Sequence, residues 1–182
     1  MAFEYLKSLA GGMDKNEILS ELMLIYGEDV WNYAFFLTRQ PMTADDITQD
    51  VFMKVYERLY SFRGEASIKT WLLTITRNTV RDQWRSAWFR RVVPFGVLKR
   101  DETVASAESQ ALSALVEEDV WKLVLELPTK LREVLLLHAH HQLSYVEIAE
   151  LLGISVGTMK SRLSRARAKI SQQLETEGRD TL

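Results

Sequence analysis

The sequence predicts an all-α protein of two small helical domains joined by a flexible linker, the second domain containing a helix-turn-helix. Apolar residues recur at helical spacing through most of the chain, and no segment alternates as a strand would. The three prolines stand where helices should begin or end, at Pro41, Pro94 and Pro128. Between the two periodic parts the helical spacing is lost. We therefore expect one domain over residues 1–88, a linker over 89–116 and a second domain over 117–182.

Composition narrows the class of protein. The chain has 182 residues, of which 47% are hydrophobic and 26% charged, as in a globular protein. It has no cysteine, which excludes disulfides and thiolate metal sites and favours a reducing compartment. Its first residues do not resemble a signal peptide, and no apolar run is long enough to cross a membrane. We expect a cytoplasmic protein.

The net charge of −2 hides a strong separation of charge along the chain. Residues 1–60 carry 5 cations and 10 acids, whereas residues 61–100 carry 9 cations and 2 acids. Residues 153–174 carry five cations and no acid. A protein that only coats DNA would be basic overall, so the acidic first part is expected to serve a different partner.

Two helices are predicted in the acidic part. The first runs from Glu17 to about Thr38, and the second from Thr43 to Tyr60, with Thr43 as its N-cap and Asp46 three residues later. Apolar residues of the second helix recur every four positions, with two aromatic residues widening the buried face: Ile47, Val51, Val55 and Leu59, with Phe52 and Tyr56.

The opposite side of the second helix is polar and acidic. It contains Asp46, Gln49, Asp50, Met53 and Glu57. Acids near a helix N-terminus interact favourably with the helix dipole, which accounts for Asp45 and Asp46 alone. The continuation of this surface leaves a protein-docking face as an equal alternative. A metal site is not expected, because one convex helix face supplies all the carboxylates.

The segment 62–85 mixes cations with aromatic residues. A loop containing Gly64 leads into a third helix, from Ile68 to about Trp88. A cationic stripe follows helical spacing and is accompanied by amide and aromatic side chains: Arg77, Arg81 and Arg85, with Asn78, Phe62, Trp71 and Trp84. This mixture suits single-stranded nucleic acid. The alternative is that Trp71, Leu72 and Ile75 are core residues and the arginines are merely solvated.

The C-terminal part predicts helices over 117–127 and 129–140, followed by a helix-turn-helix over 144–170. Ser144 and Glu147 have the spacing of a capping box, Gly153 suits the turn, and Ser155 caps the next helix. On that helix one set of residues is expected to face inward, namely Leu163, Ala166, Ile170 and Leu174. A basic set is expected to face solvent, namely Lys160, Arg162, Arg165, Arg167 and Lys169. This pattern favours a DNA-reading unit over an ordinary amphipathic hairpin.

No pattern in the sequence indicates catalysis. No nucleophile with a neighbouring base, phosphate-binding loop or glycine-rich fingerprint is present, so we expect a protein without enzymatic activity, small-molecule substrate or cofactor. His138, His140 and His141 lack a companion Asp, Glu or Cys at ligand spacing, and are expected to be surface polar groups rather than metal ligands.

Three motifs in this order resemble the extracytoplasmic-function sigma factors, the smallest promoter-specificity subunits of bacterial RNA polymerase. DDITQDVF resembles the polymerase-binding helix of the family, and FRGEASIKTWLLTITRNTVRDQWR resembles its minus-ten segment. LPTKLREVLLLHAHHQLSYVEIAELLGISVGTMKSRLSRARAKI resembles the domain that reads the minus-thirty-five element. Before Ser144 the family commonly has an acidic residue followed by glycine, where this chain has His140, His141 and Gln142.

The resemblance implies three sets of contact residues. Those that dock on the coiled coil of the largest polymerase subunit are Asp46, Gln49, Asp50 and Met53. Those that bind the minus-ten element, with the loop 62–70 holding a flipped base, are Phe62, Arg63, Lys69, Thr70, Trp71, Arg77, Asn78, Arg81 and Arg85. Those at the minus-thirty-five element are Ser155, Thr158, Lys160, Ser161, Ser164 and Arg165. Implied partners are core polymerase, promoter DNA (duplex at minus thirty-five, single-stranded at minus ten) and an anti-sigma protein, often bound to the membrane.

Two other functions fit the residues less well. A stand-alone helix-turn-helix regulator would explain the C-terminal part but leave the acidic helix and the segment 62–85 without a role. A DNA-processing enzyme lacks a catalytic centre. Direct binding to core polymerase separates the first interpretation from both others.

Overall fold

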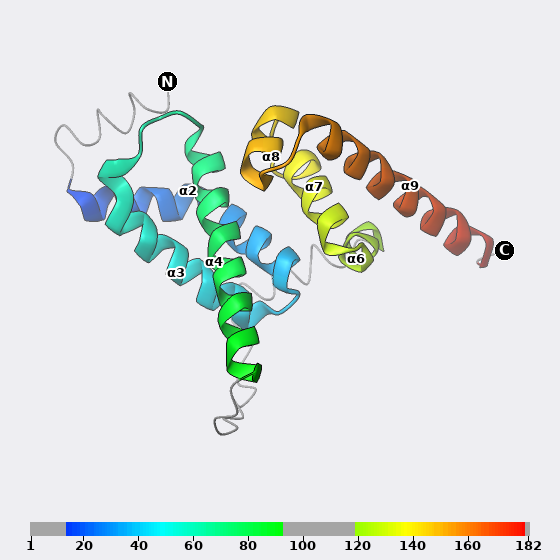
Figure 1. The fold of residues 1–182 in the computed structure, drawn as a ribbon, viewed down its shortest axis with the longest axis horizontal. Coiled ribbons are helices and arrows are strands. Elements are labelled where there is room, and N and C mark those ends of the chain that lie inside the picture. The colour runs from blue at the N-terminus through cyan, green and yellow to red at the C-terminus, as the bar shows by residue number, and fades with distance from the viewer. Residues whose placement is uncertain (1–13, 93–118, 181–182) are drawn as a thin grey trace. The chain divides into compact units, whose positions relative to one another are not determined.

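The computed structural model describes residues 14–92 and 119–180, which form helices joined by short connections and contain no strand (Figure 1). The all-α prediction is confirmed. The chain divides into two compact units, residues 1–105 and 106–182. Most of the predicted linker, residues 93–116, lies outside the described residues, so the exact domain boundaries stay a prediction.

The N-terminal unit packs three long helices against one another: α2 (Lys15–Thr38), α3 (Pro41–Arg58) and α4 (Ile68–Val92), with the short 3₁₀ turn η1 (Leu59–Ser61) after α3. Asp14 and Glu17 form a capping box at the start of α2. The helix ends at Arg39, whose left-handed backbone (φ 60°) lets its N–H donate to the Phe35 carbonyl. Side chains from all three helices fill the core, including Tyr33, Phe36, Ile47, Leu72 and Leu73.

The start and one face of α3 differ from the prediction. The helix begins at Pro41 after an N-cap at Gln40, because proline at a first helical position loses no hydrogen bond and has the required φ. Thr43 therefore lies in the first turn, where its hydroxyl donates to Gln40 Oε1 at 2.9 Å. Tyr56, expected in the core, is 36% exposed and lies beneath the Lys15 ammonium, 4.2 Å from the ring centroid.

The C-terminal unit contains α6 (Asp119–Glu126), α7 (Thr129–Ala139), α8 (Tyr145–Leu152) and α9 (Val156–Asp180). α9 packs against the other three. Arg132, at the start of α7, is only 2% exposed. Its guanidinium donates to the carbonyls of Leu125 (2.6 Å) and Leu127 (3.4 Å), which satisfies acceptors at the end of α6 that the helix leaves unpaired.

Two expectations for this unit are wrong. Leu174 is 43% exposed rather than inward, because α9 has 25 residues and is much longer than the helices of 8 to 11 residues that it packs on. His141 is 1% exposed rather than a surface group. Beyond it, Gln142 takes φ 60°, and the chain turns so that the Leu143 N–H reaches the Leu137 carbonyl at 3.0 Å.

Candidate protein- and nucleic-acid-binding surfaces

The outer face of α3 is acidic and open to solvent. Its four predicted docking residues are all exposed, and Met53 is 65% exposed: Asp46, Gln49, Asp50 and Met53. Glu57, on the same side of the helix, is exposed as well. Asp45 behaves differently, because its carboxylate accepts the indole N–H of Trp31 at 2.6 Å and so ties α3 to α2. The acidic run therefore contains one carboxylate that supports the fold and others that face outward.

A polar hollow of about 440 Å³ adjoins this face between α3 and α4. Its lining includes Asp46, Asp50, Asp82 and Lys54, whose ammonium donates to Thr79 Oγ1 at 3.0 Å. Sequence reasoning did not select Asp82, which lies 32 residues beyond Asp50 within a basic segment. An acidic residue next to the arginines of a basic helix is unusual, and this pattern could have pointed to Asp82. The hollow offers negative charge to a cationic side chain of a partner.

The loop before α4 is held by its own side chains. The rings of Phe62 and Trp71 lie 5.0 Å apart and tilted by 51°, and both residues are half-buried. Gly64 has φ 72°, a conformation that favours glycine. Arg63 is exposed. Both rings are therefore partly accessible and Arg63 is exposed, which suits contact with an unstacked base and a phosphate.

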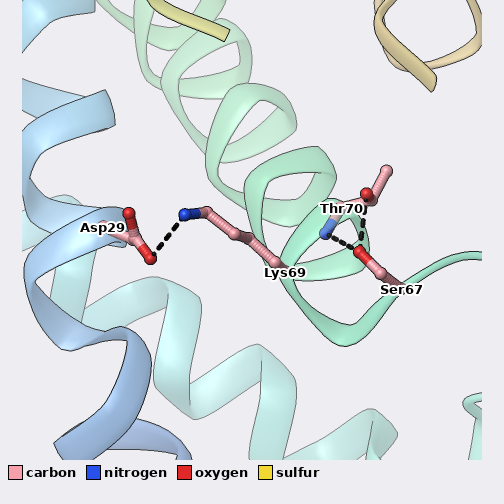
Figure 2. Close-up of polar contacts among 4 residues, drawn as sticks. All are labelled: Asp29, Ser67, Lys69 and Thr70. Atoms are coloured by element: carbon pink, nitrogen blue, oxygen red, sulfur yellow. Dashed lines mark hydrogen bonds and ion pairs between the residues drawn. The ribbon is translucent and has the colours of Figure 1, made fainter. Parts of the chain in front are cut away.

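Two predicted contact residues at the start of α4 have partners within the protein (Figure 2). The Ser67 hydroxyl accepts the Thr70 N–H at 3.0 Å and lies 2.8 Å from the Thr70 hydroxyl, which caps the helix. Thr70 is 6% exposed. The Lys69 ammonium lies 3.0 Å from the Asp29 carboxylate on α2. Thr70 thus holds the loop in shape, and part of the Lys69 charge is neutralised.

Asp29 was not predicted as part of this site, because 40 residues separate it from Lys69 in sequence. Its charge has a second effect. The pKa of Tyr26 is raised, mainly because the phenol is partly buried and also because the Asp29 carboxylate disfavours a second negative charge nearby.

The cationic stripe of α4 agrees in part with both interpretations, binding of single-stranded nucleic acid and a core face with solvated arginines. Leu72 and Ile75 are buried, as a core face requires. Asn78, Arg81 and Arg85 are exposed, whereas Arg77 is half-buried. Trp84 is 46% exposed beside Arg81 and Arg85 and offers an aromatic face among the cations.

The helix-turn-helix has the local contacts that its sequence predicts. The Ser144 hydroxyl accepts the Glu147 N–H (3.3 Å) and the Glu147 carboxylate accepts the Ser144 N–H (2.9 Å), which confirms the capping box. Gly153 has φ 65° at the turn. The Ser155 hydroxyl then accepts the Thr158 N–H at 3.1 Å and caps α9.

The first turns of α9 present polar and basic side chains to solvent. Four of the predicted reading residues are exposed: Lys160, Ser161, Ser164 and Arg165. Arg165 lies along its own helix, where Nε donates to the Ser161 carbonyl at 3.2 Å. Ser155 is exposed and Thr158 is half-buried, with their hydroxyls 2.9 Å apart at the helix start. Backbone N–H groups and hydroxyls at a helix start are suited to phosphate oxygens.

The three histidines take part in ring contacts within the C-terminal unit. The His138 ring lies 5.1 Å from that of Tyr145, and the His140 ring meets Trp121 edge-on at 5.7 Å. His140 and His141 are 4.8 Å apart. In residues 14–92 and 119–180, no helix combines the length and the apolarity needed to cross a membrane.

Comparison with known proteins gives two family matches in the order of the motifs. Residues 22–90 match the family Sigma-70 region 2, and residues 117–170 match Sigma-70, region 4. The chain is 34% identical over 169 residues to the RNA polymerase sigma factor YlaC of Bacillus subtilis, covering 89% of this chain and 95% of YlaC. It is 33% identical over 154 residues to the ECF RNA polymerase sigma-E factor of Haemophilus influenzae, covering 78% and 81%.

Among solved structures, the chain is similar to the sigma factor RpoE from Bartonella quintana, crystallised with the anti-sigma factor NepR. The two chains are 28% identical, the match covers 87% of this chain and 97% of the other, and the TM-score is 0.65.

Proposed function

The chain belongs to the extracytoplasmic-function family of RNA polymerase sigma factors. On that premise we propose which of its surfaces binds the polymerase and which bind each promoter element. The N-terminal unit binds core polymerase and the minus-ten element, and the C-terminal unit reads the minus-thirty-five element. The observation that carries this assignment is the presence, in one chain, of an exposed acidic helix face and an exposed basic helix-turn-helix face.

Core polymerase docks on the outer face of α3. Asp46, Asp50 and Gln49 supply charge and hydrogen-bond acceptors, and Met53 supplies apolar contact area at 65% exposure. Asp82 joins this surface from α4 through the polar hollow. The partner surface is therefore basic with an apolar strip, and association should weaken as salt rises.

The minus-ten element is bound by the loop before α4 and by the exposed stripe of α4. Phe62 and Trp71 receive an extruded base on their accessible edges, and Arg63 lies close enough in sequence to meet its phosphate. Arg81 and Arg85 follow the strand backbone, with Asn78 beside them. Thr70, which is buried, positions the loop, and Lys69 does so through its ion pair with Asp29.

The minus-thirty-five element is read by α9 in the major groove. Lys160, Ser161, Ser164 and Arg165 lie on its exposed side in the first turns, where a recognition helix presents side chains to base edges. For Arg165 to reach a base it must give up its bond to the Ser161 carbonyl. Ser155 and Thr158 contact phosphate at the helix start.

An anti-sigma protein restrains the factor. This partner is supported by the resemblance and by the relative of 28% identity that was crystallised with one. The factor itself acts without catalysis, and because bacterial transcription takes place in the cytoplasm, we place it there.

The test is to combine the purified chain with core RNA polymerase and to follow transcription from a library of promoters. We expect a stable complex and initiation only when both proteins are present. A stand-alone regulator would bind duplex DNA with equal affinity in the absence of polymerase and would form no complex with it. That result would refute the proposed function.

A further inference from the structure

The first half of α2 presents apolar side chains on the side away from its core. Ile18 and Leu22 of this half are 1% and 3% exposed and pack inward. On the opposite side, Leu24 is 87% exposed and Met23 is 48% exposed. Two small residues, Ser20 and Gly27, lie on the same side. Counted from Ser20, the four positions are spaced 0, 3, 4 and 7, which places them all on one side of the helix: Ser20, Met23, Leu24 and Gly27. We call these four residues the α2 outer face.

Gly27 gives this face a second, independent signal. It lies inside a helix of 24 residues, where alanine would be more stable. Apart from its chain neighbours and the adjacent backbone of its own helix, a Cβ at this position would have no atom of the described residues within 4 Å, and its backbone does not have a positive φ. The described chain itself therefore does not require glycine here. A missing side chain beside Met23 and Leu24 allows another helix to approach closely.

The charges beside the α2 outer face indicate what kind of helix this is. Glu17, Glu21 and Glu28 follow one another along one edge of the face, at spacings of four and seven residues. Lys15 is the only cation in the sequence of α2. The complementary surface is an amphipathic helix with an apolar stripe and basic residues along one edge.

We propose that the α2 outer face binds an amphipathic helix of the anti-sigma protein, with the acidic edge selecting its basic flank. The inference rests on the proposed function, which supplies the anti-sigma partner. None of the four residues is among those assigned to polymerase or promoter DNA. One helix of the anti-sigma protein can therefore bind α2 while other parts of the same protein cover the surfaces on α3 and α4.

The main test compares Leu24→Arg with the matched control Ile25→Arg in the full chain. Ile25 is 51% exposed but lies about 100° around the helix from Leu24, off the outer face. An arginine at position 24 keeps helix propensity and has Glu21 and Glu28 as helix neighbours, but repels a basic partner. In uninduced cells of the native host, a reporter from a promoter of this factor should rise about tenfold with Leu24→Arg, because an anchor of the interface is lost. With Ile25→Arg it should stay at the wild-type level.

Purified components separate this result from effects on transcription itself. Both variants should bind core polymerase and support transcription in vitro as well as wild type. Loss of polymerase affinity in Leu24→Arg would assign the face to polymerase and overturn the proposal. A lowered Tm of Leu24→Arg would mean that the chain covers the face itself, and would also overturn it. Failure of the wild-type chain to bind polymerase would instead refute the proposed function.

Gly27→Ala provides a variant that should stabilise the fold of the N-terminal unit while weakening its complex with the partner helix. Alanine should raise the Tm of the N-terminal unit by about 4–8 °C, because it is the better helix former at a site with free space. The same methyl group should hold the partner helix away and raise reporter activity in uninduced cells. Unchanged reporter activity in Gly27→Ala and Leu24→Arg, or a wild-type reporter already fully active without induction, would overturn the proposal.

Discussion

The two units of this sigma factor present the residues proposed to bind DNA in different ways. In the C-terminal unit the proposed reading residues lie on one exposed side of α9, where Arg165 bonds to Ser161 of its own helix. In the N-terminal unit several predicted contact residues already have partners elsewhere in the unit: Lys69 with Asp29, Thr70 with Ser67, and Phe62 with Trp71. The first surface can be substituted one residue at a time, whereas the second is coupled to the fold.

The largest effect that tests this comparison is expected on α9. Arg165→Ala should remove a base contact, cost about 1–3 kcal/mol at one base position and relax the preference there. Lys169→Ala, further along the helix, should weaken binding to all sequences alike and reduce the salt dependence. Transcription from a library of minus-thirty-five variants measures both.

A uniform loss in both variants, with no change in base preference, would show that α9 lies in the groove in a different orientation. A control substitution of a cation in this unit should avoid Arg132. This residue is buried and bonded to the end of α6, so Arg132→Lys would disturb the fold.

The next effect concerns polymerase docking. Asp50→Lys reverses a charge on the exposed face of α3 and should weaken core polymerase binding by about 1–2 kcal/mol, mainly through slower association. Because the side chain is exposed, helical content by circular dichroism should not change. Glu28→Lys, an equal charge reversal on α2, should leave polymerase binding unaffected. If Asp50→Lys binds as wild type does, α3 is not the docking face.

A smaller effect should reveal how the N-terminal unit couples binding to its fold. Asp29→Asn removes the partner of Lys69 and frees its ammonium for phosphate. Because the ion pair is only partly buried, we expect a loss of stability below about 1 kcal/mol together with tighter binding of single-stranded minus-ten DNA by the holoenzyme. The measurements are thermal unfolding and binding of a labelled oligonucleotide at several salt concentrations. Weaker DNA binding in a stably folded Asp29→Asn variant would mean that the ion pair shapes the loop productively.

The sequence predicted helices far better than it predicted the loop before α4. The regular spacing on α3 and α9 identified the exposed faces, and Ser144, Gly153 and Ser155 identified the turn, because these signals are local in sequence. Tyr56 was expected in the core, but it is 36% exposed and its ring contacts Lys15, 41 residues earlier. Lys69 and Asp82 depend on residues of other helices in the same manner. Such contacts arise from tertiary packing, which periodicity does not contain.

The smallest expected effect is at the turn before the helix-turn-helix. Gln142 has φ 60°, a region that costs a residue with a side chain about 1–2 kcal/mol relative to glycine. Gln142→Gly loses the bond from the side-chain amide to the Ala139 carbonyl, so the net gain should be below about 1 kcal/mol. Chemical denaturation measures it. A clear loss of stability would show that this side-chain bond outweighs the backbone strain.

The buried guanidinium of Arg132 has a mechanical consequence. It joins the first turn of α7 to two carbonyls, that of Leu125 in the last turn of α6 and that of Leu127 just after it. A hinge between two helices normally absorbs tension, but here a pull on the chain ahead of Asp119 would be transmitted through α6 into α7. Since α7 packs on α9, the tension would reach the helix that we propose reads DNA. The junction of α6 and α7 should therefore transmit force, and it should loosen when Arg132 is drawn out of its site.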